Sequence, residues 1–218
     1  AAHYIDAWIE TMRNLAAQGM AVICYNFMPV VDWTRTDIRY PTHRGGLALR
    51  FDPLEFAVYD LFVLRRTGAE ADYDDAIIER AKAHHASMDD AAIQRLESTI
   101  IAGLPGSELS HGREGIRAAI AEYDGLTLQD LRANLIRFLE KVAPAAEECG
   151  ARVCLHPDDP PFSIFGLPRV VSTEADYGAL FDAVPSLANG ITLCAGSLGS
   201  RPDNDVLAIA AAFAERVH

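Results

Sequence analysis

Apolar side chains along this chain follow two patterns that recur in a fixed order. Three times, a helical stripe of apolar residues is followed by a glycine and then by a short run of mostly apolar residues. The helices are expected at about 5–15, 127–149 and 174–184, and the strands at 21–28, 152–155 and 191–197. Continuous apolar runs are typical of parallel strands that are covered on both faces. The repetition predicts an α/β fold, either a barrel or an open doubly wound sheet.

The interval between the first and second strands is far too long for one helix–strand unit, which predicts an insertion at about residues 32–126. Within it, residues 38–40 and 47–51 could pair as a hairpin. Asp52 and Pro53 have the sequence of a helix start, with an N-cap followed by proline at the first helical position. Further helices are expected at about 73–86 and 89–102, and a flexible connection at 103–115.

The C-terminal part of the chain predicts an alanine-rich helix at about 204–216. Val217 and His218 then look like the first step of another strand. Only three core strands are visible before that point, whereas a (β/α)8 barrel needs eight. The pattern therefore predicts a folded chain with an incomplete sheet topology.

The bulk composition restricts the functional class. Of 218 residues, 50% are hydrophobic and 23% charged, an ordinary globular mixture. The net charge of −12 argues against a surface that attracts nucleic acid. No apolar run approaches the roughly 18 residues of a membrane helix. The four cysteines form no CxxC pair, which favours a reducing, cytoplasmic compartment.

The ends of the second and third strands carry the side chains best suited to chemistry. His156 follows the run 152–155, and Cys194 lies in the third run. Equivalent positions on neighbouring parallel strands are about 4.8 Å apart, so this imidazole and thiolate could reach one ion. Such a pair suits Fe²⁺, Zn²⁺ or Co²⁺ better than Mg²⁺. The alternative is that Cys194 belongs to the strand core and His156 to a polar turn.

Other polar residues near these strand ends are candidates for binding a substrate. Asp158 and Asp159 could orient His156 or contact substrate hydroxyls, and they could equally cap the turn before Pro160. Asn26 could bind a hydroxyl or a carboxylate, or else the backbone of its loop. Three arginines could each pair with a substrate carboxylate or form a structural salt bridge. These are Arg35, Arg169 and Arg201.

The remaining histidines are weaker candidates. His84 and His85 fall in a polar helix, His111 falls in the flexible connection and His3 lies near the start, so all four are expected on the surface. His43 lies in the insertion and could close over a site, although a turn position is the simpler interpretation.

Several long strings of this sequence resemble the mannonate dehydratase family of hexuronate degradation. They include Cys24-Tyr25-Asn26-Phe27-Met28-Pro29 and His156-Pro157-Asp158-Asp159-Pro160-Pro161. The strings cover residues 24–37, 68–73, 101–106, 156–161, 166–169 and 201–205. The resemblance spans essentially the whole chain.

This resemblance implies an enzyme that dehydrates D-mannonate to 2-dehydro-3-deoxy-D-gluconate with Mn²⁺ or Fe²⁺. It implies that residues 1–218 form a single partial TIM (β/α)8 barrel domain, related to the xylose-isomerase-like group, with the insertion at about 32–126. Barrel strands are then missing at both ends. His156 and Cys194 match the family's first two metal ligands, while its histidine and aspartate ligands and most of its acid/base groups are expected beyond residue 218.

On this interpretation the substrate-binding residues are Asn26, Arg35, Asp158, Asp159, Arg169 and Arg201. The chain alone is expected to be inactive. We expect a cytoplasmic homo-oligomer that binds a small sugar acid, with neither nucleic acid nor a membrane as a partner. Two alternatives remain open, namely a metal-dependent sugar or sugar-acid isomerase on the same barrel and a non-catalytic sugar-acid-binding module.

Overall fold

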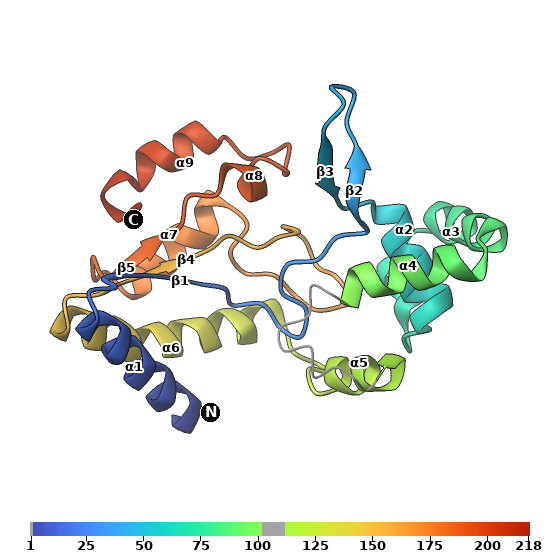
Figure 1. Ribbon diagram of the computed structural model, residues 1–218. Coiled ribbons are helices and arrows are strands. Elements are labelled where there is room, and N and C mark those ends of the chain that lie inside the picture. The colour runs from blue at the N-terminus through green and yellow to red at the C-terminus, as the bar shows by residue number, and fades with distance from the viewer. Residues whose placement is uncertain (1, 102–111) are drawn as a thin grey trace. The chain divides into compact units, whose positions relative to one another are not determined.

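The computed structural model describes residues 2–101 and 112–218, which form two compact units (Figure 1). Unit 1 comprises residues 1–28, 126–162 and 168–218, and unit 2 comprises 29–125 and 163–167. The parallel strands lie in unit 1, and the hairpin lies in unit 2. None of the described helices is long and apolar enough to cross a membrane.

Unit 1 is built on a parallel sheet with the strand order β1-β4-β5. Its strands are β1 (Val22–Tyr25), β4 (Arg152–Leu155) and β5 (Asn189–Ile191). This pairing confirms the predicted α/β class. Val217 also makes a single parallel bridge to Ile191, so the last residues extend the sheet by one step as predicted.

Two strands of unit 1 are shorter than the sequence predicts. β1 ends at Tyr25 rather than at residue 28. The last hydrogen bond from the β4 side to β1 runs from His156 N to Tyr25 O, and the next donor in that series, Asp158 N, donates instead to Val171 O (2.8 Å). The third strand ends at Ile191, before Cys194, since the chain turns there and begins a short helix. The expected strand through residue 197 is therefore wrong.

The helices of unit 1 pack on this sheet around one apolar core. They are α1 (Ala2–Ala17), α6 (Leu128–Glu148), α7 (Glu174–Ala183), α8 (Ala195–Leu198), α9 (Val206–Ala212) and the 3-10 turn η3 (Ala214–Arg216). Leu135 and Leu139 of α6 and Leu155 of β4 are almost completely buried in this core. In Figure 1, α1 and α6 lie side by side.

The start of α6 agrees with its sequence signal. Thr127 accepts a hydrogen bond from the backbone N–H of Asp130, and the Asp130 carboxylate accepts one in return, which makes a full capping box. α6 continues past Pro144 to Glu148, and a bend at this proline stays a prediction. Gly150 then adopts a φ of 70°, the left-handed conformation that ends many helices.

Unit 2 contains a hairpin followed by a series of helices. The hairpin pairs β2 (Asp37–Pro41) with β3 (Leu47–Arg50), as the sequence predicts. The helices are α2 (Pro53–Val58), the π-helix η1 (Tyr59–Leu64), the 3-10 turn η2 (Ala69–Asp72), α3 (Asp75–Ser87), α4 (Asp90–Ile101) and α5 (Gly112–Ala121). Asp52 caps α2 as expected, by accepting a bond from Leu54 N.

One predicted segment of unit 2 differs from the structure. The flexible connection was expected at 103–115, and residues 102–111, including His111, lie outside the described residues. From Gly112 onward the chain is helical in α5, so that part of the expectation is wrong. Ile116 and Ile120 of α5 explain the helix, because they are spaced four residues apart and both are buried in the core of unit 2.

Candidate functional site at the strand ends of unit 1

Polar groups from all three strands of unit 1 meet at the carboxyl edge of the sheet. The register pairs Tyr25 with Leu155 and Leu155 with Ile191. Backbone hydrogen bonds continue one step further, from His156 N to Tyr25 O (2.9 Å) and from Thr192 N to Leu155 O (3.1 Å). Open α/β proteins bind their ligands at the carboxyl ends of the parallel strands.

His156 is half-buried at this edge and one of its ring nitrogens has a partner. Its Nδ1 lies 2.7 Å from the carbonyl oxygen of Pro157. Because a carbonyl only accepts hydrogen bonds, Nδ1 carries the proton and donates. In the neutral ring the lone pair is then on Nε2, which is the arrangement found in metal-binding histidines.

Cys194 lies at the same edge but not level with His156. By register, Thr192 is the residue beside His156, and Cys194 follows two positions later as the N-cap of α8. The chain reaches it through a tight turn in which Cys194 N donates to Thr192 O (2.8 Å). The thiol is half-buried. Cys194 is therefore a residue of the strand–helix turn rather than of the strand core.

A different cysteine occupies the strand core. Cys154 in β4 is fully buried, and burial raises the pKa of its thiol to about 11. A thiol with such a pKa stays protonated at neutral pH and serves as a small apolar side chain. Of these two thiols, Cys194 is the one that a ligand could reach.

Ser197 links the loop after β4 to the turn after β5. Its Oγ lies 3.0 Å from Asp159 Oδ2 and 3.2 Å from Cys194 Sγ. The side chain is buried, with 3% exposure. No motif in the sequence selects this serine, because the apolar pattern predicts a strand through residue 197. Its position three residues after Cys194 becomes meaningful only once α8 is known to start there, since residues three apart share a helix face.

Asp158 points into the protein and holds its own loop. One carboxylate oxygen, Oδ2, accepts hydrogen bonds from Val171 N (2.6 Å) and Ser172 Oγ (2.9 Å). Burial raises the pKa of Asp158, and the charge of Arg169 together with these hydrogen bonds opposes that shift. Both residues are buried, with exposures of 1% and 6%. Asp158 thus closes the loop that carries Asp159.

The two remaining arginines take different partners. Arg201 makes a bidentate salt bridge with Asp203 (3.0 and 2.5 Å) and also donates to Pro161 O (3.0 Å). The structural salt bridge considered from the sequence is therefore present, and a role of Arg201 in substrate binding stays a prediction. Arg35 belongs to unit 2, where its guanidinium lies 4.3 Å from the centre of the Trp33 ring and donates to Thr34 O (2.7 Å). Asn26 is exposed just after β1 in unit 1.

The donor set at the edge fits a transition metal. Among residues 2–101 and 112–218, no group of three or more His, Cys, Asp or Glu side chains is placed to hold an ion. The edge instead offers an imidazole with a free Nε2 lone pair and an accessible thiol. Nitrogen and sulfur donors suit Fe²⁺ or Zn²⁺, and further ligands are needed to close a coordination shell.

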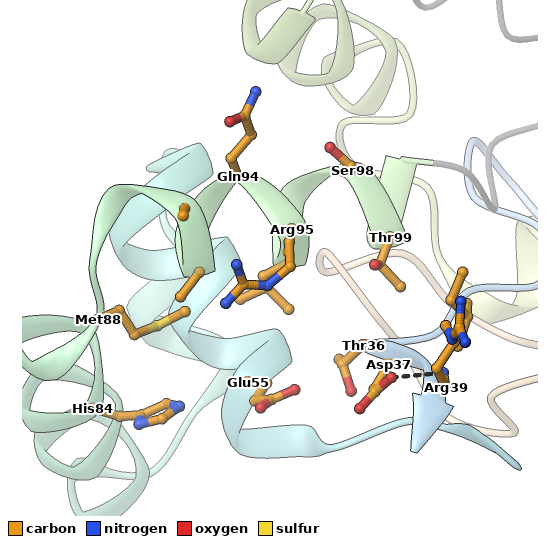
Figure 2. Close-up of a pocket in the computed structure, with 14 residues that line it drawn as sticks. Thr36, Asp37, Arg39, Glu55, His84, Met88, Gln94, Arg95, Ser98 and Thr99 are labelled. Carbon is orange, nitrogen blue, oxygen red and sulfur yellow. Dashed lines mark hydrogen bonds between the residues drawn. The ribbon is translucent and has the colours of Figure 1, made fainter. Parts of the chain in front are cut away.

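A separate cavity lies in unit 2. It has a volume of about 760 Å³ and is lined by residues of α4, together with residues of β2, α2 and α3. Figure 2 shows Glu55, His84 and Arg95 around it. None of the candidate metal ligands or substrate contacts lines this cavity. His85, the neighbour of His84, stacks on Phe62 with ring centroids 5.5 Å apart.

The fold and its polar strand ends define an α/β protein of the kind that binds ligands at the carboxyl edge of a parallel sheet. The model of the D-mannonate dehydratase (UxuA) family matches residues 1–218, and the chain belongs to that family. The resemblance found in the sequence is thereby confirmed.

Several curated relatives are named mannonate dehydratase. Mannonate dehydratase 2 of Agrobacterium fabrum is 51% identical over 214 residues, which are 98% of this chain and 54% of the relative. Mannonate dehydratase of Chromohalobacter salexigens is 51% identical over 215 residues, 99% of this chain and 55% of the relative. The chain spans about half the length of the curated relatives it matches.

A solved structure is also similar. The crystal structure of mannonate dehydratase from Streptococcus suis serotype 2 superposes with a TM-score of 0.66 at 31% identity. The similarity covers 98% of this chain and 47% of that chain. Both units of the chain therefore have counterparts in one known enzyme structure.

Proposed function

We propose that the full-length protein dehydrates D-mannonate to 2-dehydro-3-deoxy-D-gluconate, and that His156 and Cys194 supply part of its metal site. The match of the family model over residues 1–218 carries this proposal. Relatives named mannonate dehydratase support it at 48–51% identity. We further propose that the parallel sheet of unit 1 is part of a TIM barrel and that residues 32–126 are an insertion in it.

His156 would hold the ion through Nε2, because its Nδ1–H is bound to Pro157 O. Cys194 would hold it through Sγ. We propose Mn²⁺ or Fe²⁺ as the ion, and the softness of a thiolate ligand favours Fe²⁺. The relatives are nearly twice as long as this chain, and we assign the other ligands and the acid and base to that additional length.

The reaction removes a proton from C2 and the hydroxyl group from C3 of the substrate, and the resulting enol tautomerises to the 2-keto acid. A bound divalent ion would stabilise the negative charge that develops next to the substrate carboxylate. Residues of this chain would bind and orient the sugar acid. We propose Asn26, Asp159 and Arg201 of unit 1 as its contacts, with buried Asp158 and Arg169 supporting the loop.

Alanine variants of the two ligands test the metal site. We expect purified full-length His156→Ala and Cys194→Ala to lose bound metal and dehydration activity, measured by elemental analysis and by release of the 2-keto acid. His84→Ala is the matched control, since His84 lies at the cavity of unit 2. Normal metal content and turnover in both ligand variants would refute the assignment.

The mass of the product separates the enzymatic alternatives. A dehydratase releases a product that is lighter than D-mannonate by one water, whereas an isomerase releases a product of the same mass. Calorimetric binding of D-mannonate with no turnover under any metal would instead favour a sugar-acid-binding module.

The cellular setting follows from the same proposal. Cys24, Cys149, Cys154 and Cys194 are free thiols, which agrees with a reducing compartment. We therefore propose that the enzyme is cytoplasmic. As a separate proposal, we expect it to assemble as a homo-oligomer.

A further inference from the structure

Ser197 is the one buried hydroxyl that lies within hydrogen-bond distance of both a candidate ligand and a candidate substrate contact in the described part of the chain. It joins Asp159 and Cys194, which are 35 residues apart in the sequence but lie at the same edge of unit 1. A hydroxyl has one proton and two lone pairs. It can therefore donate to only one of these two neighbours at a time, while it stays in contact with both.

The backbone around Cys194 does not by itself fix the position of its sulfur. The residue lies outside the sheet ladder, in a turn between Thr192 and the four-residue helix α8. A cysteine side chain has three staggered rotamers, which point the sulfur in three different directions. The 3.2 Å contact with Ser197 Oγ favours one of them.

Ser197 is itself held from two sides. Its backbone carbonyl accepts a hydrogen bond from Ser200 Oγ (2.7 Å), and its hydroxyl contacts the Asp159 carboxylate (3.0 Å). Asp159 in turn follows Asp158, whose carboxylate is fixed in the buried loop. The position of Cys194 Sγ is thus connected through Ser197 and Asp159 to the buried, hydrogen-bonded loop of Asp158.

We propose that Ser197 is a positioning residue that orients Cys194 Sγ for metal binding, and that Asp159 anchors the Ser197 hydroxyl. The inference rests on the proposed metal site of His156 and Cys194. It links Asp159 to the cysteine ligand through the Ser197 hydroxyl. Groups that orient metal ligands in this way typically change metal affinity by about 10–100-fold when removed.

Titration of the metal-free full-length protein with Co²⁺ tests this role. Co²⁺ is a useful probe because a thiolate–cobalt bond has its own charge-transfer absorption, which reports the cysteine ligand directly. We expect Ser197→Ala to bind Co²⁺ about 10–100-fold more weakly and with a weaker absorption per bound ion. Ser197→Thr keeps the hydroxyl and is expected to restore most of both.

Ser186→Ala is the matched control, because Ser186 also lies in unit 1 but precedes β5, whereas Cys194 follows that strand, and its hydroxyl donates to Glu147 Oε1 (2.5 Å). Its affinity should stay within about twofold of the wild type. If Ser197→Ala does not fold, as judged by circular dichroism, Asp159→Ala replaces it, since it leaves Ser197 in place and removes the anchor. A several-fold weaker affinity is then expected.

The outcomes separate this inference from the proposed function. Wild-type affinity and absorption in Ser197→Ala, or in Asp159→Ala when that variant replaces it, overturn the positioning role. Cys194→Ala should abolish the absorption entirely. If Cys194→Ala binds Co²⁺ with an unchanged spectrum, the metal site itself is wrong, whatever the serine variants show.

Discussion

Unit 1 and unit 2 each bring charged or polar side chains together, but the two groups differ in what they leave accessible. In unit 2, Asp60 is completely buried and accepts bonds from Arg66 Nε (2.9 Å), Arg66 Nη2 (2.8 Å) and Tyr73 OH (2.9 Å). Arg66 also pairs with Asp72. Each of these four side chains makes a hydrogen bond or an ion pair with another member of the cluster, within the same unit.

At the carboxyl edge of the sheet in unit 1, the polar side chains use only part of their hydrogen-bonding capacity on other protein groups. His156 uses one ring nitrogen on Pro157 O, and Cys194 receives a contact from Ser197 while remaining half-buried. The comparison teaches that burial of charge alone does not mark a functional site. A saturated buried cluster holds a fold together, whereas partly satisfied donors at a strand end are available to a ligand.

The largest effect should come from breaking the saturated cluster. Asp60→Ala leaves the buried Arg66 guanidinium without its main partner, and breaking such a buried ion pair typically costs about 3–5 kcal/mol. We expect the free energy of unfolding in urea to fall by that amount. Asp72→Ala is the control, because the Asp72 side chain is 40% exposed and its loss should cost about 1 kcal/mol or less. Equal effects of the two changes would contradict the comparison.

Asp158 is the residue of unit 1 that resembles Asp60, and it should have an intermediate effect. Asp158→Ala leaves Val171 N–H and Ser172 Oγ without their acceptor in a buried site, which should cost about 2–4 kcal/mol in urea unfolding. Ser172→Ala removes only one of these bonds and should cost about 1 kcal/mol. An Asp158→Ala variant as stable as the wild type would show that the loop does not depend on this carboxylate.

The sequence predicted correctly those helix starts that are determined by hydrogen bonds between neighbouring residues. Thr127 and Asp130 make the expected capping box, and Asp52 and Pro53 begin α2 as expected, because each signal acts within one turn of helix. The hairpin was also predicted. The strand end at Ile191 was not, since Leu193 and Cys194 continue the apolar run and only the turn into α8 ends the ladder.

The candidate site was predictable only in part for the same reason. His156 and Cys194 could be selected because their residue types are rare good ligands at the ends of apolar runs. Ser197 could not, because its significance depends on Asp159 from a different loop. The cluster around Asp60 was also missed, although a carboxylate in the apolar run 56–64 was a signal that it needs a buried partner.

The smallest effect on folding should come from the accessible ligand. With metal removed by a chelator, His156→Ala loses one hydrogen bond at a half-buried position, so the free energy of unfolding should fall by about 1 kcal/mol or less. With metal added, the wild type should gain stability in proportion to the logarithm of metal concentration, because ligands that bind only the folded state stabilise it. His156→Ala should gain much less. If His156→Ala destabilises the metal-free protein as strongly as Asp60→Ala does, then the sheet edge is as structural as the cluster of unit 2, and the distinction between the two regions fails.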